Sequence, residues 1–172
     1  YKPSSPYAET KKATEKLVQN AYKENGLNTN VLRLGTIFGT SIGMRFHTAV
    51  NKFCYLAALN KPLTVWDSAI NNKRPYLGLN AAINAFMFVE KNGAPGELYN
   101  ILTENYTVQE MVDEIRKVVP DLKVVITKSP ILNQKSYDVS DAKIRRLGFI
   151  PQDNLEEEVR KTIELFKAIK NP

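Results

Sequence analysis

The first predicted helix begins with Ser5-Pro6-Tyr7-Ala8-Glu9-Thr10-Lys11. Serine is a favoured N-cap and proline a favoured first helical residue, so we expect this helix to run from Pro6 to about residue 24, before Gly26. Tyr7 and Lys11 are four residues apart, which places their side chains on one face of the helix, one turn apart. An ammonium group beside a phenol favours the phenolate, so the pair can act as a general base for a hydroxyl proton. The alternative is a partly buried tyrosine beside a solvated lysine.

Outward from this helix, helical and extended segments alternate, which predicts an α/β fold. The predicted strands and extended pieces are residues 31–34, 63–66, 75–79, 97–102 and 123–127, with a turn at 35–39. The further predicted helices are residues 46–59, 81–90 with Asn80 as cap, 107–118 with a Thr107/Glu110 capping box, 140–147, and a last helix capped by Asn154. The first units are typical of the C-terminal part of a Rossmann-like doubly wound sheet. The shorter later elements are typical of a small α/β substrate-binding subdomain.

The composition of the 172 residues, 43% hydrophobic and 24% charged, is that of a globular domain. No apolar run approaches the roughly 20 residues that span a bilayer, so we expect a soluble, cytoplasmic protein with no membrane partner. The single Cys54 and single His47 predict structural roles, without a disulfide framework or a metal site. The net charge is +6, and the basic residues are interleaved with 18 acidic residues along the chain. This distribution disfavours nucleic acid as a partner and suits a small phosphate-bearing molecule.

The segment from Ser5 to Lys11 closely resembles the active-site helix of the extended short-chain dehydrogenase/reductase family, which includes the NAD-dependent nucleotide-sugar epimerases and dehydratases. Other segments resemble that family in the same order along essentially the whole chain. They are Val31-Leu32-Arg33-Leu34-Gly35-Thr36-Ile37-Phe38-Gly39, Leu63-Thr64-Val65-Trp66, Lys73-Arg74-Pro75-Tyr76, Glu97-Leu98-Tyr99-Asn100-Ile101 and Leu147-Gly148-Phe149-Ile150-Pro151.

The resemblance implies roles for four residues near the cofactor. Tyr7 would be the catalytic acid/base, and Lys11 would favour its phenolate and hold the cofactor ribose. The backbone near Leu34 and Thr36 would meet the nicotinamide. The implied cofactor is NAD, with NADP less favoured.

The resemblance also implies a site for a nucleotide-diphosphate sugar. Asn51 and Arg74 would bind the diphosphate, Lys135 would add a second cation there, and Thr64 and Trp66 would line the base pocket. For Arg74 the chemistry agrees, because a guanidinium fork matches phosphate oxygens. The alternatives are a solvated helix face for Asn51, a core position for Trp66 and simple surface charge for Arg74.

The chain also departs from the family pattern. Thr36 stands where relatives often carry asparagine, and Gly78-Leu79-Asn80 replaces the acidic residues that commonly precede the next helix. No Gly-x-x-Gly-x-x-Gly loop occurs. We therefore expect residues 1–60 to be the end of an NAD-binding Rossmann domain and residues 61–172 to form mainly the nucleotide-sugar subdomain. The N-terminal Gly-rich half of the same protein would be a missing partner.

The function expected from the resemblance is that of the C-terminal portion of an NAD-dependent nucleotide-sugar epimerase, foremost a UDP-sugar 4-epimerase, which works as a homodimer. By itself the chain is expected to be inactive. A 4,6-dehydratase or reductase of the same family is the first alternative. A non-catalytic family member that binds NAD or a nucleotide is the second.

Overall fold

The computed structural model describes residues 5–128 and 136–170, in which helices and strands alternate along most of the chain. The helices are α1 (Pro6–Asn25), α2 (Ala49–Ala58), α3 (Leu79–Asn92), α4 (Val108–Val118), α5 (Ala142–Arg146) and α6 (Leu155–Lys170), with a 3₁₀ turn η1 (Asp67–Ala69). The strands are β1 (Val31–Leu34), β2 (Thr36–Phe38), β3 (Leu63–Trp66), β4 (Arg74–Gly78), β5 (Leu98–Ile101), β6 (Glu104–Tyr106) and β7 (Val124–Thr127). The predicted α/β class is confirmed.

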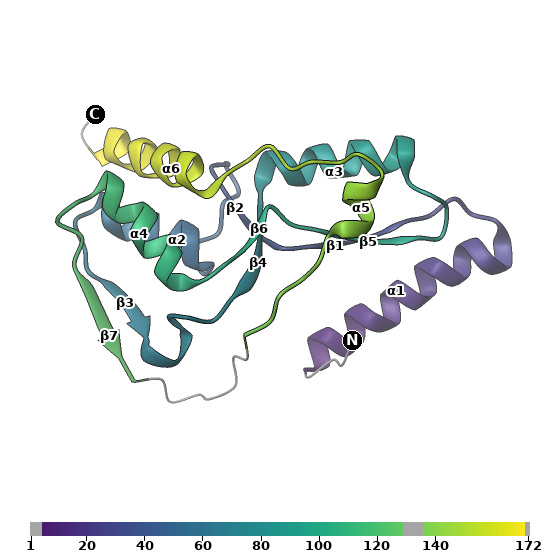
Figure 1. Ribbon diagram of the computed structural model, residues 1–172, viewed down its shortest axis with the longest axis horizontal. Coiled ribbons are helices and arrows are strands. Elements are labelled where there is room, and N and C mark those ends of the chain that lie inside the picture. The colour runs from purple at the N-terminus through teal and green to yellow at the C-terminus, as the bar shows by residue number, and fades with distance from the viewer. Residues whose placement is uncertain (1–4, 129–135, 171–172) are drawn as a thin grey trace.

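The strands form three small sheets, and most of their pairs are parallel. β1 pairs with β5 in parallel, β3 pairs with β7 in parallel, and β4 lies between parallel β2 and antiparallel β6. Parallel neighbours need long crossover connections, which the helices supply. Figure 1 shows α3 on one side of the β1–β5 pair and α1 on the other, the arrangement of a doubly wound sheet.

Two hydrophobic clusters hold these layers together. The first lies among α2, α4, α6, β3 and β4, and it includes Phe53, Met111 and Ile163. The second packs the alanine-rich face of α3 against β5 and α5, and it includes Tyr99 and Ile144. The first cluster contains residues from both sides of position 60. The domain boundary that we expected at this position stays a prediction.

Three elements differ from their predicted form. Residues 36–38 form a strand where a turn was expected, because Gly35 lets the chain run close to β4: a Cβ there would lie 3.0 Å from the Tyr76 carbonyl carbon. The polar strand β6 was not predicted, and it pairs with β4. α2 begins at Ala49 rather than residue 46, since the Phe46 ring packs beside Tyr55, with their centroids 5.0 Å apart.

The start of α3 is capped from a distant part of the chain. The predicted cap, Asn80, is wrong: the N-cap residue is Gly78, which has no side chain. Asp153 instead accepts a hydrogen bond from the Ala81 amide at 2.8 Å. A side chain at Gly78 would overlap the Asp153 carboxylate, so glycine at one position and aspartate at the other depend on each other. The acidic group missing before this helix is thus supplied from the C-terminal segment.

Candidate functional site

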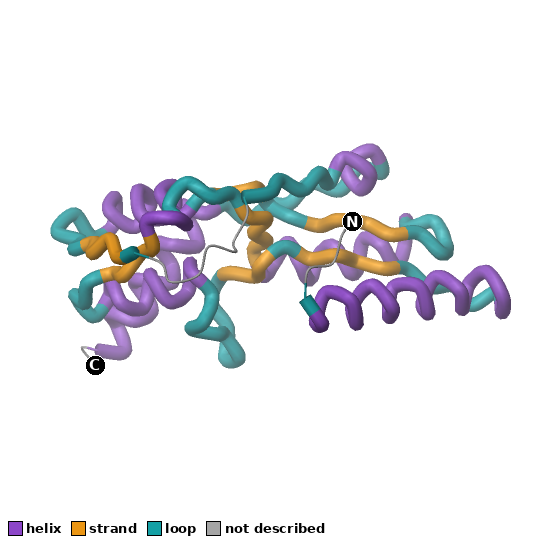
Figure 2. Tube along the Cα trace, turned by 90° about the horizontal axis from the view of Figure 1, so that it is seen from below, coloured by secondary structure: helices purple, strands orange, loops and turns teal. Residues whose placement is uncertain are grey.

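Helix α1 lies along the β1–β5 pair and is fixed to it by polar contacts. The Arg33 guanidinium donates two hydrogen bonds to the Glu15 carboxylate, at 2.7 and 2.5 Å, and Gln19 donates to the Gly96 carbonyl at 3.3 Å. No residue of α1 is fully buried in the described part of the chain. Figure 2 shows the helix lying alongside the strands, with its other sides facing away from them.

Tyr7 and Lys11 lie together in the first turns of α1. The Lys11 Nζ atom is 5.6 Å from the centroid of the Tyr7 ring, as the four-residue spacing predicts. Ser5 caps the helix by accepting a hydrogen bond from the Ala8 amide at 3.2 Å. The Tyr7 side chain is 72% exposed, so the partly buried alternative is wrong and the phenol is open to a ligand.

Leu34 and Thr36 lie at the carboxyl end of β1, where the chain crosses from β1 to β2. The Gly35 amide between them donates to the Ile101 carbonyl at 2.9 Å, which ties this crossing to the end of β5. Because α1 runs antiparallel to β1, Tyr7 and Lys11 lie toward the same end of the strands (Figure 1). In open α/β sheets, ligands bind outside the carboxyl ends of the strands. The joint contact of these four residues with a cofactor stays a prediction.

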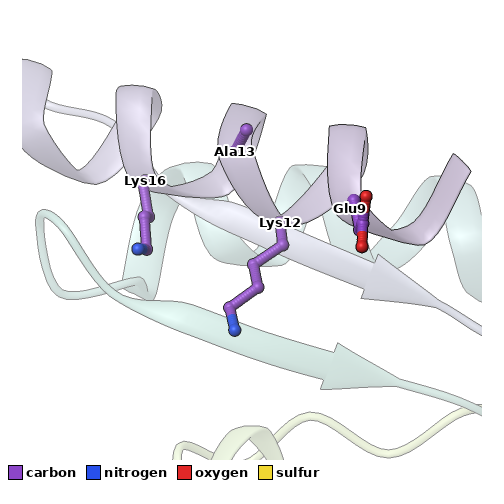
Figure 3. A pocket seen from close by; sticks show the side chains of 4 residues that line it. All are labelled: Glu9, Lys12, Ala13 and Lys16. Carbon is purple, nitrogen blue, oxygen red and sulfur yellow. The ribbon is translucent and has the colours of Figure 1, made fainter. Parts of the chain in front are cut away.

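A hollow of about 250 Å³ lies on a different face of α1. It is lined by Glu9, Lys12, Ala13 and Lys16. Figure 3 shows the side chains of Lys12 and Lys16 extending from the helix toward the strands beneath it. Tyr7 and Lys11 do not line this hollow, so the predicted catalytic pair and the hollow are separate features of the helix.

Asn51 is buried, with only 4% of its surface exposed, so the solvated-face alternative is wrong. Its Oδ1 atom accepts a hydrogen bond from the Gly39 amide at 3.3 Å, and its Nδ2 atom donates to the Arg45 carbonyl at 3.2 Å. The side chain thus ties Gly39, the first residue of the loop between β2 and α2, to Arg45 within the same loop. Its contact with a diphosphate stays a prediction.

Thr64 and Trp66 lie on the outer face of β3. Leu63 and Val65 alternate with them and point into the core, which is the pattern of a half-buried strand. Trp66 is 40% exposed, so the core alternative for this residue is wrong. The two side chains stand two residues apart on one face, where a flat ligand can lie against them.

Arg74 begins β4 and packs against an aromatic ring. Its guanidinium carbon is 4.7 Å from the centroid of the Tyr137 ring. Burial raises the pKa of the neighbouring Tyr76, the Arg74 charge opposes that rise, and Tyr137 adds to it. Sequence reasoning missed Tyr137, because no motif links it to a residue so far away in the chain. Lys135, predicted to add a second cation, lies outside the described residues.

Cys54 and His47, both expected to be structural, differ in their surroundings. Cys54 is fully buried, and burial raises the pKa of its thiol to about 12. His47 is exposed in the loop before α2. Within residues 5–128 and 136–170, no group of three His, Cys, Asp or Glu side chains is arranged to hold a metal ion. None of the helices in this part of the chain combines the length and apolar character that crossing a bilayer requires.

Comparison with known proteins places this arrangement in a family. The model of the NAD dependent epimerase/dehydratase family matches residues 1–101. Over 169 residues the chain is 30% identical to the trifunctional UDP-glucose 4,6-dehydratase/UDP-4-keto-6-deoxy-D-glucose 3,5-epimerase/UDP-4-keto-L-rhamnose-reductase RHM3 of Arabidopsis thaliana, covering 95% of this chain and 25% of that protein. Over 174 residues it is 26% identical to the dTDP-D-glucose 4,6-dehydratase of Homo sapiens, covering 96% of this chain and 49% of that protein.

A solved structure matches the fold. The UDP-glucose 4-epimerase of Thermotoga maritima, determined with UDP-glucose, superposes with a TM-score of 0.85 at 22% identity. The match covers 99% of this chain and 56% of the other. The chain therefore spans about half the length of the human dehydratase and of this epimerase, and a quarter of the plant enzyme.

Proposed function

This chain belongs to the NAD dependent epimerase/dehydratase family, and we propose that it is the C-terminal portion of an enzyme that oxidises a nucleotide-diphosphate sugar. The observation that carries the proposal is the placement of Tyr7 and Lys11 side by side, exposed, toward the carboxyl end of β1. A tyrosine in its phenolate form can take a proton from a sugar hydroxyl.

The residues at this edge fit the nicotinamide end of NAD. Lys11 offers a charged donor for ribose hydroxyls, and the exposed residues Leu34 and Thr36 flank the crossing from β1 to β2, where we propose that the carboxamide binds. When bound, NAD supplies the acceptor for the hydride that leaves the sugar carbon.

Tyr7 and Lys11 have distinct roles in this mechanism. The Tyr7 oxygen takes the hydroxyl proton as the carbon is oxidised and returns a proton when the carbonyl is reduced. The Lys11 ammonium lies beside the Tyr7 ring, and we propose that it holds the cofactor ribose.

We propose that the substrate contacts come from β3, β4 and α2. Arg74 has a guanidinium suited to the two phosphates, and Trp66 with Thr64 offers a face for the base. Asn51 holds the loop that comes after β2, so we propose that it shapes the diphosphate site through that loop. The whole protein would supply the pyrophosphate-binding half, and the exposed faces of α1 suit a homodimer contact.

Two reactions share this oxidation and differ in the later steps. The plant and human relatives are named for 4,6-dehydration, which favours that reaction over the UDP-sugar 4-epimerisation expected from the sequence. Epimerisation stays the second candidate, because Tyr7 and Lys11 serve both reactions equally.

The test uses the full-length protein with NAD and either UDP-glucose or dTDP-glucose, and the products are identified by NMR. A 4-keto-6-deoxy sugar supports dehydration, and a C4 epimer supports epimerisation. Changing Tyr7→Phe should lower kcat by about 10²- to 10⁴-fold, the usual contribution of a general acid/base. Tyr22→Phe, a tyrosine on the same helix away from its first turns, is the matched control. Undiminished turnover in Tyr7→Phe would refute the proposal.

A further inference from the structure

The contact between Tyr137 and Arg74 joins two distant parts of the chain. The Arg74 guanidinium carbon lies 4.7 Å from the Tyr137 ring centroid, within the roughly 6 Å range of a cation–π interaction. The Tyr137 ring is 48% exposed, so burial of a core residue does not account for its position. The contact therefore suggests a role in holding Arg74.

The backbone around Tyr137 is fixed to the strands beneath it. We call residues 136–140 the strap. The Lys73 amide donates to the Ser136 hydroxyl at 3.0 Å, and the Tyr137 amide donates to the Lys73 carbonyl at 3.3 Å. Asn105 of β6 exchanges two hydrogen bonds with the backbone of Val139, at 2.9 and 3.0 Å. Because the strap is anchored on both sides of Tyr137, the position of the ring is set before any ligand binds.

Stacking leaves the donors of Arg74 available. A ring covers one face of a guanidinium, whereas its N–H donors point outward in the plane of the group. Three other arginines pair with carboxylates: Arg33 with Glu15, Arg116 with Asp113 and Arg145 with Asp141. Among residues 5–128 and 136–170, no carboxylate pairs with Arg74. The Arg74 guanidinium is therefore oriented by the Tyr137 ring, and its N–H donors are open to an anion.

We propose that Tyr137 is a positioning residue for the nucleotide-diphosphate substrate, because its ring on the fixed strap holds the Arg74 guanidinium in place for the phosphates. The inference rests on the proposed function in one respect, that Arg74 binds the diphosphate. Holding the side chain beforehand reduces the rotamer freedom that binding would otherwise remove. The effect should therefore be confined to ligands that carry the diphosphate.

The test measures dissociation constants of the full-length protein for UDP, dTDP and uridine by isothermal titration calorimetry. In Tyr137→Leu, binding of the nucleoside diphosphates should weaken about two- to fivefold, the range of a cation–π contact at a partly exposed site. Uridine binding should not change. Tyr137→Phe keeps the ring and should bind as the unaltered protein does. Tyr137→Met, a second ring-free variant, serves if the leucine variant does not fold.

A double-mutant cycle separates positioning from a general structural effect. In an Arg74→Gln background, Tyr137→Leu should cause no further loss, because the group that the ring holds is gone. An equal loss in both backgrounds, or a loss in Tyr137→Phe as large as in Tyr137→Leu, would overturn the inference. If the unaltered protein binds the diphosphates and Tyr137→Leu binds them equally well, the inference fails and the proposed function stands. If the unaltered protein binds neither UDP nor dTDP, both fail.

Discussion

Removing the Asp153 carboxylate that caps α3 should destabilise the protein. Introducing a new cap at residue 78 should then restore part of the lost stability. In Asp153→Ala, the Ala81 amide loses the acceptor that lies 2.8 Å away, at a helix start whose N-cap residue, Gly78, has no side chain. Loss of an N-cap costs about 0.5–2 kcal/mol, and the lost charge near the positive end of the helix adds about 0.3–1 kcal/mol. We expect a loss of about 2 kcal/mol in the free energy of unfolding.

The exchange itself is the sharper test. Gly78→Asp alone should destabilise the protein by about 1–3 kcal/mol, because the new side chain overlaps Asp153. In an Asp153→Gly background, which removes both the carboxylate and the Cβ that would lie 2.3 Å from the new Cβ, the same change should instead restore part of the lost stability. The φ of −65° and ψ of 147° at Gly78 are open to any residue and suit an N-cap aspartate.

Two measurements check these values. Urea unfolding of the whole protein gives the total change, and native-state hydrogen exchange at the Ala81 amide gives the local change, with tenfold faster exchange for each 1.4 kcal/mol if opening is local. Asp121→Ala, an exposed aspartate, is the matched control and should change stability by less than about 0.5 kcal/mol. The reasoning is refuted if Asp153→Ala is as stable as this control, or if Gly78→Asp costs the same in the unaltered protein and in the Asp153→Gly background.

Two further predictions concern other close contacts. Gly96→Ala should lower the free energy of unfolding by about 2 kcal/mol or more, because Gly96 has φ of 77° and a Cβ there would overlap the Tyr22 ring. Adding Tyr22→Ala to this variant should recover only the part of the loss that is due to overlap, as measured by urea unfolding. Cys54 should react with a thiol reagent at pH 8 no faster than the protein unfolds, since burial raises its pKa to about 12 and the thiolate is the reactive form. Rapid labelling of the folded protein would contradict this.

Local signals in the sequence predicted local structure well. The Thr107/Glu110 capping box is present, and the Glu157 amide donates to Asn154 at 2.8 Å, as the spacing of those residues predicted. The spacing of Tyr7 and Lys11 likewise predicted their shared face. Each of these features depends on residues within one turn of a helix.

The missed features depend on residues far apart in the chain. Asp153 caps a helix 72 residues away, and no pattern near Gly78 could reveal that acceptor. Strand β6 is three mostly polar residues, too short for an alternating pattern, and exists because β4 offers it a partner. Asn51 had a signal that was available, since Val50, Phe53 and Cys54 around it are apolar and an amide among them is expected to be buried.

The strand pairing also dictates an order of events as the chain emerges from the ribosome. Val31 pairs with Leu98 and Leu63 pairs with Val124, each more than sixty residues later in the chain. At about 5–20 residues per second, β1 stands without its β5 partner for roughly 3 to 13 s. During this time β1 lacks its β5 partner, and β3 lacks β7 until residue 124 has been made. Slowing translation near residue 98 should therefore increase capture of this nascent chain by chaperones, whereas slowing it after residue 127 should have a smaller effect.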